Sequence, residues 1–257
     1  MGVVRNLSVS AMAGVVGVTS IAAAHGPMPI ARRVNGVLAA DLTLDAVYLC
    51  RDLDCNGDFR GAGESNLFLG AGNASGLNAT GAVFAMVQAI DGTVYIADGD
   101  TDTVYAAKDL NKDGDAMDVG EVRAYITTFN AALLPMPTPN GLAVGPDGSV
   151  YIVNSGVSAS PLDAVFRTRD LNADGDADDF GEQSVFIDMT AIGVLNSAPF
   201  ECSVIGSTVY FLDTRGGADD VILSGRDADN SGSVDATELG TYFIETMTST
   251  VPLAFSC

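Results

Sequence analysis

The sequence predicts an all-β fold built from four copies of one structural repeat. Four apolar segments each run into an acidic stretch, and these stretches begin at Asp52, Asp109, Asp170 and Asp227, at spacings of 57, 61 and 57 residues. The segments between Gly- and Pro-containing turns alternate apolar and polar residues, as half-buried strands do, and none has a helical period. A period of about 58 residues suits one four-stranded blade with a long insert. We therefore predict a four-bladed β-propeller.

The repeats are expected to place their strands in one order, with the acidic loop between the last two. The first repeat contains three recognisable strands, at residues 35–40, 46–50 and 66–69. The second repeat has strands at residues 83–87, 94–97, 103–107 and 122–127. The third has strands at residues 141–144, 149–153, 164–168 and 184–188. The fourth has strands at residues 200–205, 208–212, 221–224 and 241–244.

The first repeat lacks an innermost strand, and the end of the chain offers one. Residues 251–257 (VPLAFSC) follow the last strand of the fourth repeat, where the next innermost strand is due. We predict that this segment completes the first blade and closes the ring, so that residues 25–257 form a single domain. An open solenoid is the alternative, but it does not require a repeat that is split between the two chain ends.

Acidic loops of the D-x-D-x-D-G type separate the two outer strands of every repeat. The predicted metal ligands are Asp52, Asp54, Asn56, Asp58 and Glu64 in the first loop, Asp109, Asn111, Asp113, Asp115, Asp118 and Glu121 in the second, Asp170, Asn172, Asp174, Asp176, Asp179 and Glu182 in the third, and Asp227, Asp229, Ser231, Ser233, Asp235 and Glu238 in the fourth. Calcium takes about six to eight hard oxygen ligands, and alternate side chains of a tight turn converge on one side. We therefore predict about four structural Ca²⁺ ions, one per blade.

These loops resemble the calcium loops of EF-hand and thrombospondin type 3 proteins, over about 13 residues in each of four places. The fourth loop matches the EF-hand pattern position by position, whereas Gly61 replaces the late aspartate in the first loop and Arg60 adds a positive charge. We expect the first site to bind most weakly. Solvated acidic turns are the alternative, but their carboxylates would repel one another without a cation. Magnesium is disfavoured because it demands a rigid octahedron.

The charge balance restricts the partners of the chain. It has 12 Lys and Arg residues against 33 Asp and Glu residues, a net charge of -21. Nucleic-acid phosphates and anionic membrane surfaces would repel such a chain, so divalent cations are the expected partners. Disorder is disfavoured because 47% of the residues are hydrophobic.

The N-terminus is predicted to be a secretory signal peptide. Arg5 precedes a small-residue apolar stretch, and residues 22–24 (AAA) offer a cleavage site, so residues 1–24 would be removed. The mature chain would then be secreted, periplasmic or on the cell surface, without membrane insertion; an uncleaved anchor is the alternative. In an oxidising compartment the four cysteines can form two disulfides, for which we expect Cys50–Cys55 and Cys202–Cys257, with free thiols as the alternative.

A catalytic site has weaker support. His25 is the only histidine, which excludes Ser/His and Cys/His arrangements elsewhere in the chain. Residues 139–144 (PNGLAV) and 146–152 (PDGSVYI) resemble a blade of the NHL-repeat and gluconolactonase/regucalcin propellers. In the latter family an Asn of such a stretch binds a catalytic divalent metal on the axis, which the resemblance would assign to Asn140. Glu201 begins the next innermost strand and could face the same channel mouth.

Three functional hypotheses follow. The first, which we favour, is a secreted binding or adhesion module that calcium makes rigid, with an unidentified extracellular ligand. The second is a calcium-dependent, lactonase-like hydrolase that uses Asn140 and Glu201. The third is a structural component of a surface layer or matrix that assembles through calcium.

Overall fold

The computed structural model describes residues 18–24, 36–127, 138–155, 163–194, 197–214 and 220–244. Within these residues all regular elements are strands, and sixteen strands form four antiparallel sheets of four. The predicted all-β propeller architecture is therefore confirmed. The described residues contain no helix long and apolar enough to cross a membrane.

Each sheet is a run of four strands consecutive in the chain. The first sheet contains β1 (Val18–Ala24), β2 (Gly36–Asp41), β3 (Ala46–Arg51) and β4 (Ser65–Gly70). The second contains β5 (Val83–Gln88), β6 (Val94–Asp98), β7 (Thr103–Ala107) and β8 (Val122–Ile126). The third contains β9 (Pro139–Val144), β10 (Val150–Asn154), β11 (Ala164–Thr168) and β12 (Gln183–Asp188). The fourth contains β13 (Pro199–Ile205), β14 (Thr208–Asp213), β15 (Val221–Gly225) and β16 (Leu239–Ile244).

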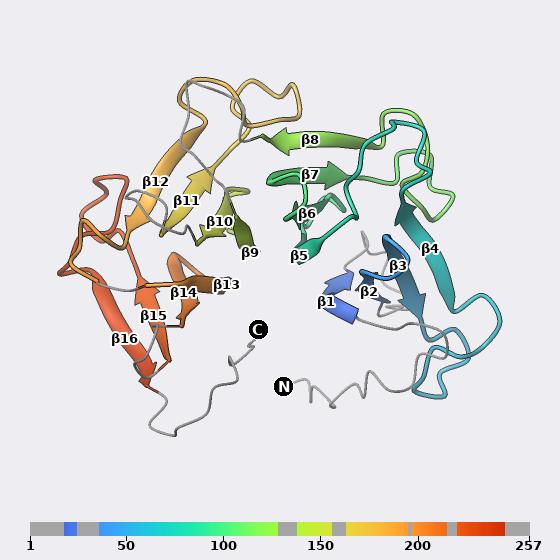
Figure 1. Cartoon of the computed structure of the whole chain (residues 1–257), viewed down its shortest axis with the longest axis horizontal. Coiled ribbons are helices and arrows are strands. Elements are labelled where there is room, and N and C mark those ends of the chain that lie inside the picture. The colour runs from blue at the N-terminus through green and yellow to red at the C-terminus, as the bar shows by residue number, and fades with distance from the viewer. Residues whose placement is uncertain are drawn as a thin grey trace.

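The four sheets stand around a common centre, with β1, β5, β9 and β13 nearest to it and β4, β8, β12 and β16 at the periphery (Figure 1). Strand β1 lies against β5, β5 against β9, and β9 against β13. Three buried apolar clusters, which include Leu38, Phe166 and Phe211, fill the three spaces between successive sheets. Among the described residues no such cluster joins the fourth sheet to the first.

The innermost strand of the first sheet is β1, and this corrects one prediction. We expected residues 251–257 at this position, but Val18–Ala24 pairs along the whole of β2. A short apolar run of small residues suits a buried strand as well as the apolar region of a signal peptide, so composition does not separate the two. Residues 251–257 lie outside the described residues, as do residues 1–17 and 25–35.

The second strand of every sheet ends in a buried Asp or Asn, and in three sheets this residue accepts a hydrogen bond from the segment that leads into the innermost strand. Asp98 accepts a hydrogen bond from the Ala82 N–H at 3.1 Å. Asn154 accepts one from the Thr138 N–H at 2.9 Å, and Asp213 accepts one from the Ala198 N–H at 2.9 Å. The counterpart in the first sheet is Asp41. Its Oδ2 atom is buried without a hydrogen-bond partner among the described residues.

The predicted Cys50–Cys55 disulfide is wrong. Both residues carry free thiols, with Cys50 buried on β3 and Cys55 exposed in the following loop. Cys55 has a positive φ of 62°, which the tight turn of this loop requires, and the turn holds its side chain in solvent. Cys202 is also a free, buried thiol, on β13, and its expected partner Cys257 lies outside the described residues.

Candidate metal sites

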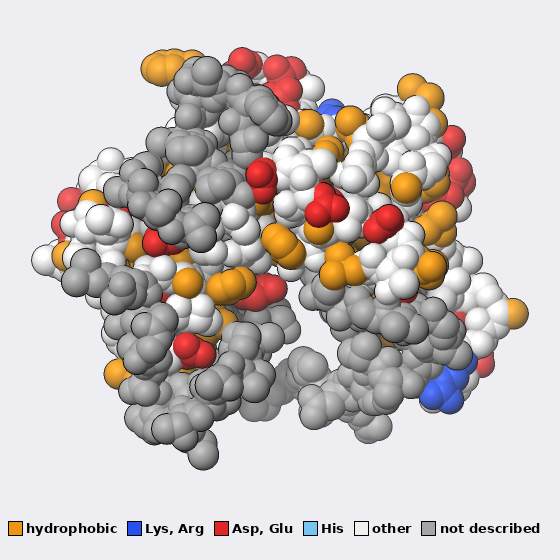
Figure 2. Space-filling view, viewed as in Figure 1, with side chains coloured by type: hydrophobic (Ala, Val, Ile, Leu, Met, Phe, Trp, Pro, Cys, Tyr) orange, Lys and Arg blue, Asp and Glu red, His pale blue; other side chains and the backbone are white. Residues whose placement is uncertain are grey.

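The four acidic loops lie where the sequence predicts them, between the two outer strands of each sheet. They span residues 52–64, 109–121, 170–182 and 227–238, which connect β3 to β4, β7 to β8, β11 to β12 and β15 to β16. Their position puts them at the periphery of the molecule (Figure 1). In the space-filling view, Asp and Glu side chains are visible along the rim, whereas Lys and Arg side chains are sparse on this face (Figure 2).

All four loops fold with the same backbone turn. The fourth residue of each loop has a positive φ, at Cys55 (62°), Lys112 (66°), Ala173 (64°) and Asn230 (60°). The sixth residue is always glycine with a larger positive φ, at Gly57 (91°), Gly114 (108°), Gly175 (101°) and Gly232 (97°). Only glycine adopts such values at low cost, which explains its fixed place in the pattern. The turn folds the first half of the loop around its own side-chain oxygens.

The first aspartate of each loop holds this turn closed. In the third loop, Asp170 Oδ2 accepts a hydrogen bond from the Gly175 N–H at 2.9 Å. The same bond joins Asp52 to Gly57, Asp109 to Gly114 and Asp227 to Gly232. An aspartate five residues before a glycine therefore has a structural reason for its position in addition to any role as a metal ligand.

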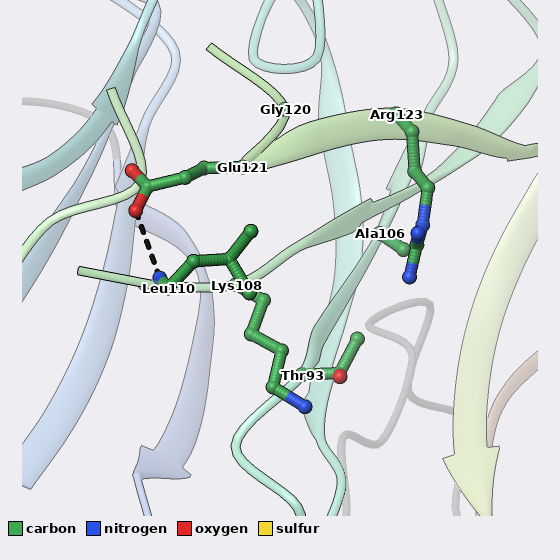
Figure 3. Close-up of a pocket in the computed structure, with 7 residues that line it drawn as sticks. All are labelled: Thr93, Ala106, Lys108, Leu110, Gly120, Glu121 and Arg123. Atoms are coloured by element: carbon green, nitrogen blue, oxygen red, sulfur yellow. Dashed lines mark hydrogen bonds between the residues drawn. The ribbon is translucent and has the colours of Figure 1, made fainter. Parts of the chain in front are cut away.

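The last glutamate of each loop is turned back into the loop and accepts three backbone hydrogen bonds. In the third loop, Glu182 Oε1 accepts from the N–H groups of Leu171 and Asn172 at 2.7 and 3.3 Å, and its Oε2 accepts from Asp179 N–H at 3.3 Å. Glu64, Glu121 and Glu238 have the same three bonds in their own loops. Figure 3 shows the second loop, where the Glu121 carboxylate meets the backbone of Leu110.

Three of these glutamates are almost entirely removed from solvent. Glu64, Glu121 and Glu182 are 1%, 3% and 4% exposed, and Glu238 is half-buried. Burial of a carboxylate is costly unless hydrogen bonds or a cation compensate it. The two ion pairs formed by the described residues, Lys108–Asp91 and Arg167–Asp147, do not involve the loop carboxylates. The loops therefore concentrate negative charge with backbone N–H groups as its main compensation.

The first and fourth loops bring three carboxylates together. Oxygen atoms of Asp52, Asp54 and Glu64 lie within 4.8 Å of one another, as do those of Asp227, Asp229 and Glu238. In the second loop the third position is Asn111, whose Nδ2 donates to Asp113 and Asp118 at 2.9 and 2.6 Å. Asn172 bridges Asp174 and Asp179 in the third loop with the same distances. The amide in these loops joins carboxylates that would otherwise repel.

The remaining predicted ligands also lie in the loops, where their side chains form hydrogen bonds with nearby groups of the same loop. Asp58, Asp115 and Asp176 each accept a hydrogen bond from the N–H two residues further on. In the fourth loop, Ser231 Oγ donates to the Ser233 carbonyl at 2.9 Å. Hydrogen bonds from the Thr237 hydroxyl and N–H lower the pKa of the exposed Asp235 carboxyl. Asn56 donates through Nδ2 to Asp54 in the first loop. Together these oxygens form a hard, anionic donor set of the kind that suits a divalent cation.

The second, third and fourth loops also bond to the preceding sheet, which sequence reasoning did not predict. The eighth loop residue donates its N–H to a carbonyl of the previous outermost strand. These bonds join Ala116 to Phe68 at 2.7 Å, Ala177 to Tyr125 at 2.9 Å, and Val234 to Phe186 at 2.7 Å. The sequence signal is an apolar residue at the eighth position of the loop, and all three of these side chains are buried. The loops therefore connect neighbouring sheets.

The predicted axial residues lie on neighbouring innermost strands. Asn140, on β9, is 6% exposed and donates through Nδ2 to Ser155 Oγ at 2.5 Å. Glu201, on β13, is half-buried, and burial raises the pKa of its carboxyl to about 7. The two strands touch here, because a Cβ added to Gly141 would lie 2.7 Å from Glu201 Cα. The structure thus brings the two strands together, with the Asn140 amide engaged by Ser155.

Comparisons with known proteins identify the fold. A scan against protein-family models gives no match, and neither does a search of curated protein sequences. The chain is similar to a solved chain of the nidogen/laminin complex, with a TM-score of 0.54 and 14% identity, over 84% of this chain and 62% of that chain. It is similar to virginiamycin B lyase from Staphylococcus aureus, with a TM-score of 0.50 and 14% identity, over 90% of this chain and 56% of that chain.

A putative gluconolactonase is a more distant match, with a TM-score of 0.44 and 16% identity, over 73% of this chain and 56% of that chain. The chain spans about three fifths or less of the length of these proteins. The first two of these neighbours are β-propeller proteins. At these identities the similarity shows the fold alone, so the chain is a β-propeller whose chemistry must be argued from its own residues.

Proposed function

We propose that this chain is a secreted calcium-binding propeller that acts as a binding scaffold, with one structural Ca²⁺ in each blade. One observation carries the proposal: the same acidic turn, closed by the same aspartate and glutamate bonds, occurs four times at the rim. A single acidic turn could be a solvated surface feature. Four identical turns, three of which bury a glutamate, are more simply explained by a shared ligand.

The ligands would come from side chains that already face one another. In the first and fourth loops these are the three clustered carboxylates. In the second and third loops, Asn111 and Asn172 would turn their amide oxygens toward the ion, because a cation removes the reason for an N–H to lie between two carboxylates. The first loop carries Arg60 and lacks the late aspartate, so its site should be the weakest.

The ion would stabilise contacts between blades as well as the loops themselves. The second, third and fourth loops donate backbone bonds to the preceding sheet, so ordering one of these loops also orders an interface between sheets. Calcium modules outside the cell commonly have a Kd of about 10⁻⁴ to 10⁻³ M, which suits the secreted location that we propose. The net charge of -21 supports a cation as partner and disfavours nucleic acid and anionic membranes.

A calorimetric calcium titration of chelator-stripped protein tests this proposal. Wild-type protein should take up about four ions, and Asp170→Asn should lose one of them because it weakens the aspartate that closes the third loop. Asp147→Asn is the matched control, since Asp147 forms an ion pair with Arg167 outside the loops and should leave the stoichiometry unchanged. Heats indistinguishable from dilution in the wild type would refute calcium binding.

A calcium-dependent, lactonase-like hydrolase is the second candidate. The observation in its favour is the raised pKa of Glu201, which lies on the strand beside Asn140 and could serve as a general acid or base near neutral pH. This hypothesis requires an ion near the axis in addition to the four at the rim. A further bound equivalent that is lost in Asn140→Ala and Glu201→Ala, together with measurable lactone hydrolysis, would support it. No hydrolysis and no further ion would exclude it.

A further inference from the structure

The three interfaces between neighbouring sheets share one construction. The outermost strand of each sheet carries one extra residue where its pairing register shifts, and this residue is aromatic every time: Phe68, Tyr125, Phe186 and Tyr242. In the first three sheets its carbonyl accepts the N–H of the eighth residue of the next loop. The aromatic ring is buried in the cluster between the two sheets. The same arrangement thus joins each sheet to the next.

The fourth sheet has the same aromatic residue at its register shift, but this residue is exposed. Tyr242 is 69% exposed, whereas Phe68, Tyr125 and Phe186 are 5%, 2% and 2% exposed. The following residue, Phe243, is 46% exposed, whereas its counterparts Leu69, Ile126 and Ile187 are fully buried. Tyr242 nevertheless makes the same edge contact with its own sheet, to Tyr210 at a centroid distance of 5.1 Å, as Tyr125 makes to Tyr95 at 4.7 Å. We call this surface, Tyr210, Tyr242 and Phe243, the trailing face.

On the first sheet, the residues that correspond to the other side of these interfaces are also more exposed than their counterparts. Tyr48 is half-buried, whereas its counterparts in the other sheets, Tyr105, Phe166 and Leu223, are 5%, 1% and 1% exposed. Leu67, which pairs with Tyr48, is 41% exposed. The eighth residue of the first loop is the half-buried Phe59, where the other loops bury Ala116, Ala177 and Val234. We call Tyr48, Phe59 and Leu67 the leading face.

We propose that the trailing face of one copy of this chain binds the leading face of a second copy, head to tail. The Phe59 N–H of one copy would donate to the Tyr242 carbonyl of the next, and the aromatic ring would be covered as in the three internal interfaces. Continuity with those interfaces supports the pairing, because both halves of a contact used three times are exposed within the described residues, one on the fourth sheet and one on the first. Such a contact joins unlike surfaces, so it produces rings or open filaments.

Calcium should strengthen this association. The leading face includes Phe59, which lies inside the first acidic loop between Asp58 and Glu64. An ion that orders this loop would hold the Phe59 N–H in place for the neighbouring copy. This dependence rests on the proposed function, whereas the pairing of the two faces does not.

Sedimentation velocity over a wide range of protein concentration tests the proposal. With calcium, the wild type should form species larger than a monomer as concentration rises, and Tyr242→Lys should weaken this association about tenfold or more. Ile90→Lys, which changes a residue 94% exposed and distant from both faces in sequence, is the matched control and should associate as the wild type does. Both variants should retain the calcium stoichiometry of the wild type, so a failure of association is separable from a failure of calcium binding.

A mixing experiment distinguishes head-to-tail contact from other kinds of dimer. Tyr242→Lys blocks the trailing face and Leu67→Lys blocks the leading face, so each variant alone should stay monomeric while an equimolar mixture forms a one-to-one complex. A wild type that is monomeric at every concentration, as it would be if the two faces met within one chain, overturns the proposal. Association of Tyr242→Lys equal to that of the wild type would overturn it as well.

Discussion

Glu182→Gln in the third loop tests the link between calcium and stability most sharply. The Glu182 carboxylate is 4% exposed and accepts N–H bonds from Leu171, Asn172 and Asp179. Glutamine keeps one oxygen for the first two bonds and places an NH₂ group against the third N–H. Loss of one charge-assisted bond in a buried position costs about 1.5 to 3 kcal/mol of unfolding free energy, and this part does not depend on calcium.

The same substitution should also weaken one calcium site. At an ion concentration about ten times the Kd, a bound ion adds about 1.4 kcal/mol to the free energy of unfolding. Glu182→Gln should therefore cost about 3 to 4.5 kcal/mol with calcium present and about 1.5 to 3 kcal/mol after chelation. The difference between the two costs measures the contribution of the third site alone.

Urea unfolding of wild type and variant, each with calcium and with chelator, supplies the four free energies required. Asp147→Asn is the control, because its ion pair with Arg167 lies outside the loops and its cost should be the same in both conditions. If Glu182→Gln costs the same with and without calcium, Glu182 is a structural carboxylate that binds no ion, and the reasoning fails for this loop.

Three further changes test the packing of the sheets. Gly141→Ala should lower the free energy of unfolding by about 2 kcal/mol or more in thermal or urea unfolding, because its Cβ would meet the backbone of Glu201. Gly72→Ala is the control and should be nearly neutral, because its Cβ would have open space. Equal costs for the two variants would contradict the close approach of β9 and β13. Glu201→Gln should remove a pH dependence of the free energy of unfolding. The folded-state pKa of Glu201, about 7, lies above the ordinary value of 4.5, so the wild type should lose about 3 kcal/mol of this free energy as the pH rises from about 4.5 to about 7. A variant whose stability falls with the same slope would refute the assignment. Asp98→Asn should lower the free energy of unfolding in urea by about 1 to 3 kcal/mol, because the amide NH₂ leaves either the Ala82 N–H or the N–H groups of Asp100 and Thr101 without an acceptor. A neutral effect would contradict a role of Asp98 in holding the start of β5.

The repeat made most of the fold predictable. All fifteen strands expected within the four repeats occur, with boundaries within two residues of those observed. This accuracy has a physical cause, since alternating apolar residues and glycine turns determine strand and loop at short range. The loop turn was equally predictable, because Gly57, Gly114, Gly175 and Gly232 occupy a position that requires positive φ.

Contacts between distant segments were not predictable from local pattern. The apolar run of β1 satisfies the composition of a signal peptide and of a buried strand, so the sequence alone did not place it beside β2. The bond from the Ala116 N–H to the Phe68 carbonyl joins backbone atoms, which leave little trace in side-chain identity. Tyr242 is 69% exposed although it occupies the same place in its repeat as the buried Phe68, Tyr125 and Phe186, so the repeat pattern alone does not give its exposure.

The number of calcium ions bound per chain tests the central claim most directly. Equilibrium dialysis of the chelator-stripped protein against calcium, followed by elemental analysis, measures this number without reference to any fold or stability model. The account predicts four ions per chain, with the weakest site in the loop that contains Asp52 and Arg60. A protein that retains its fold and binds no calcium at about millimolar concentration would contradict it.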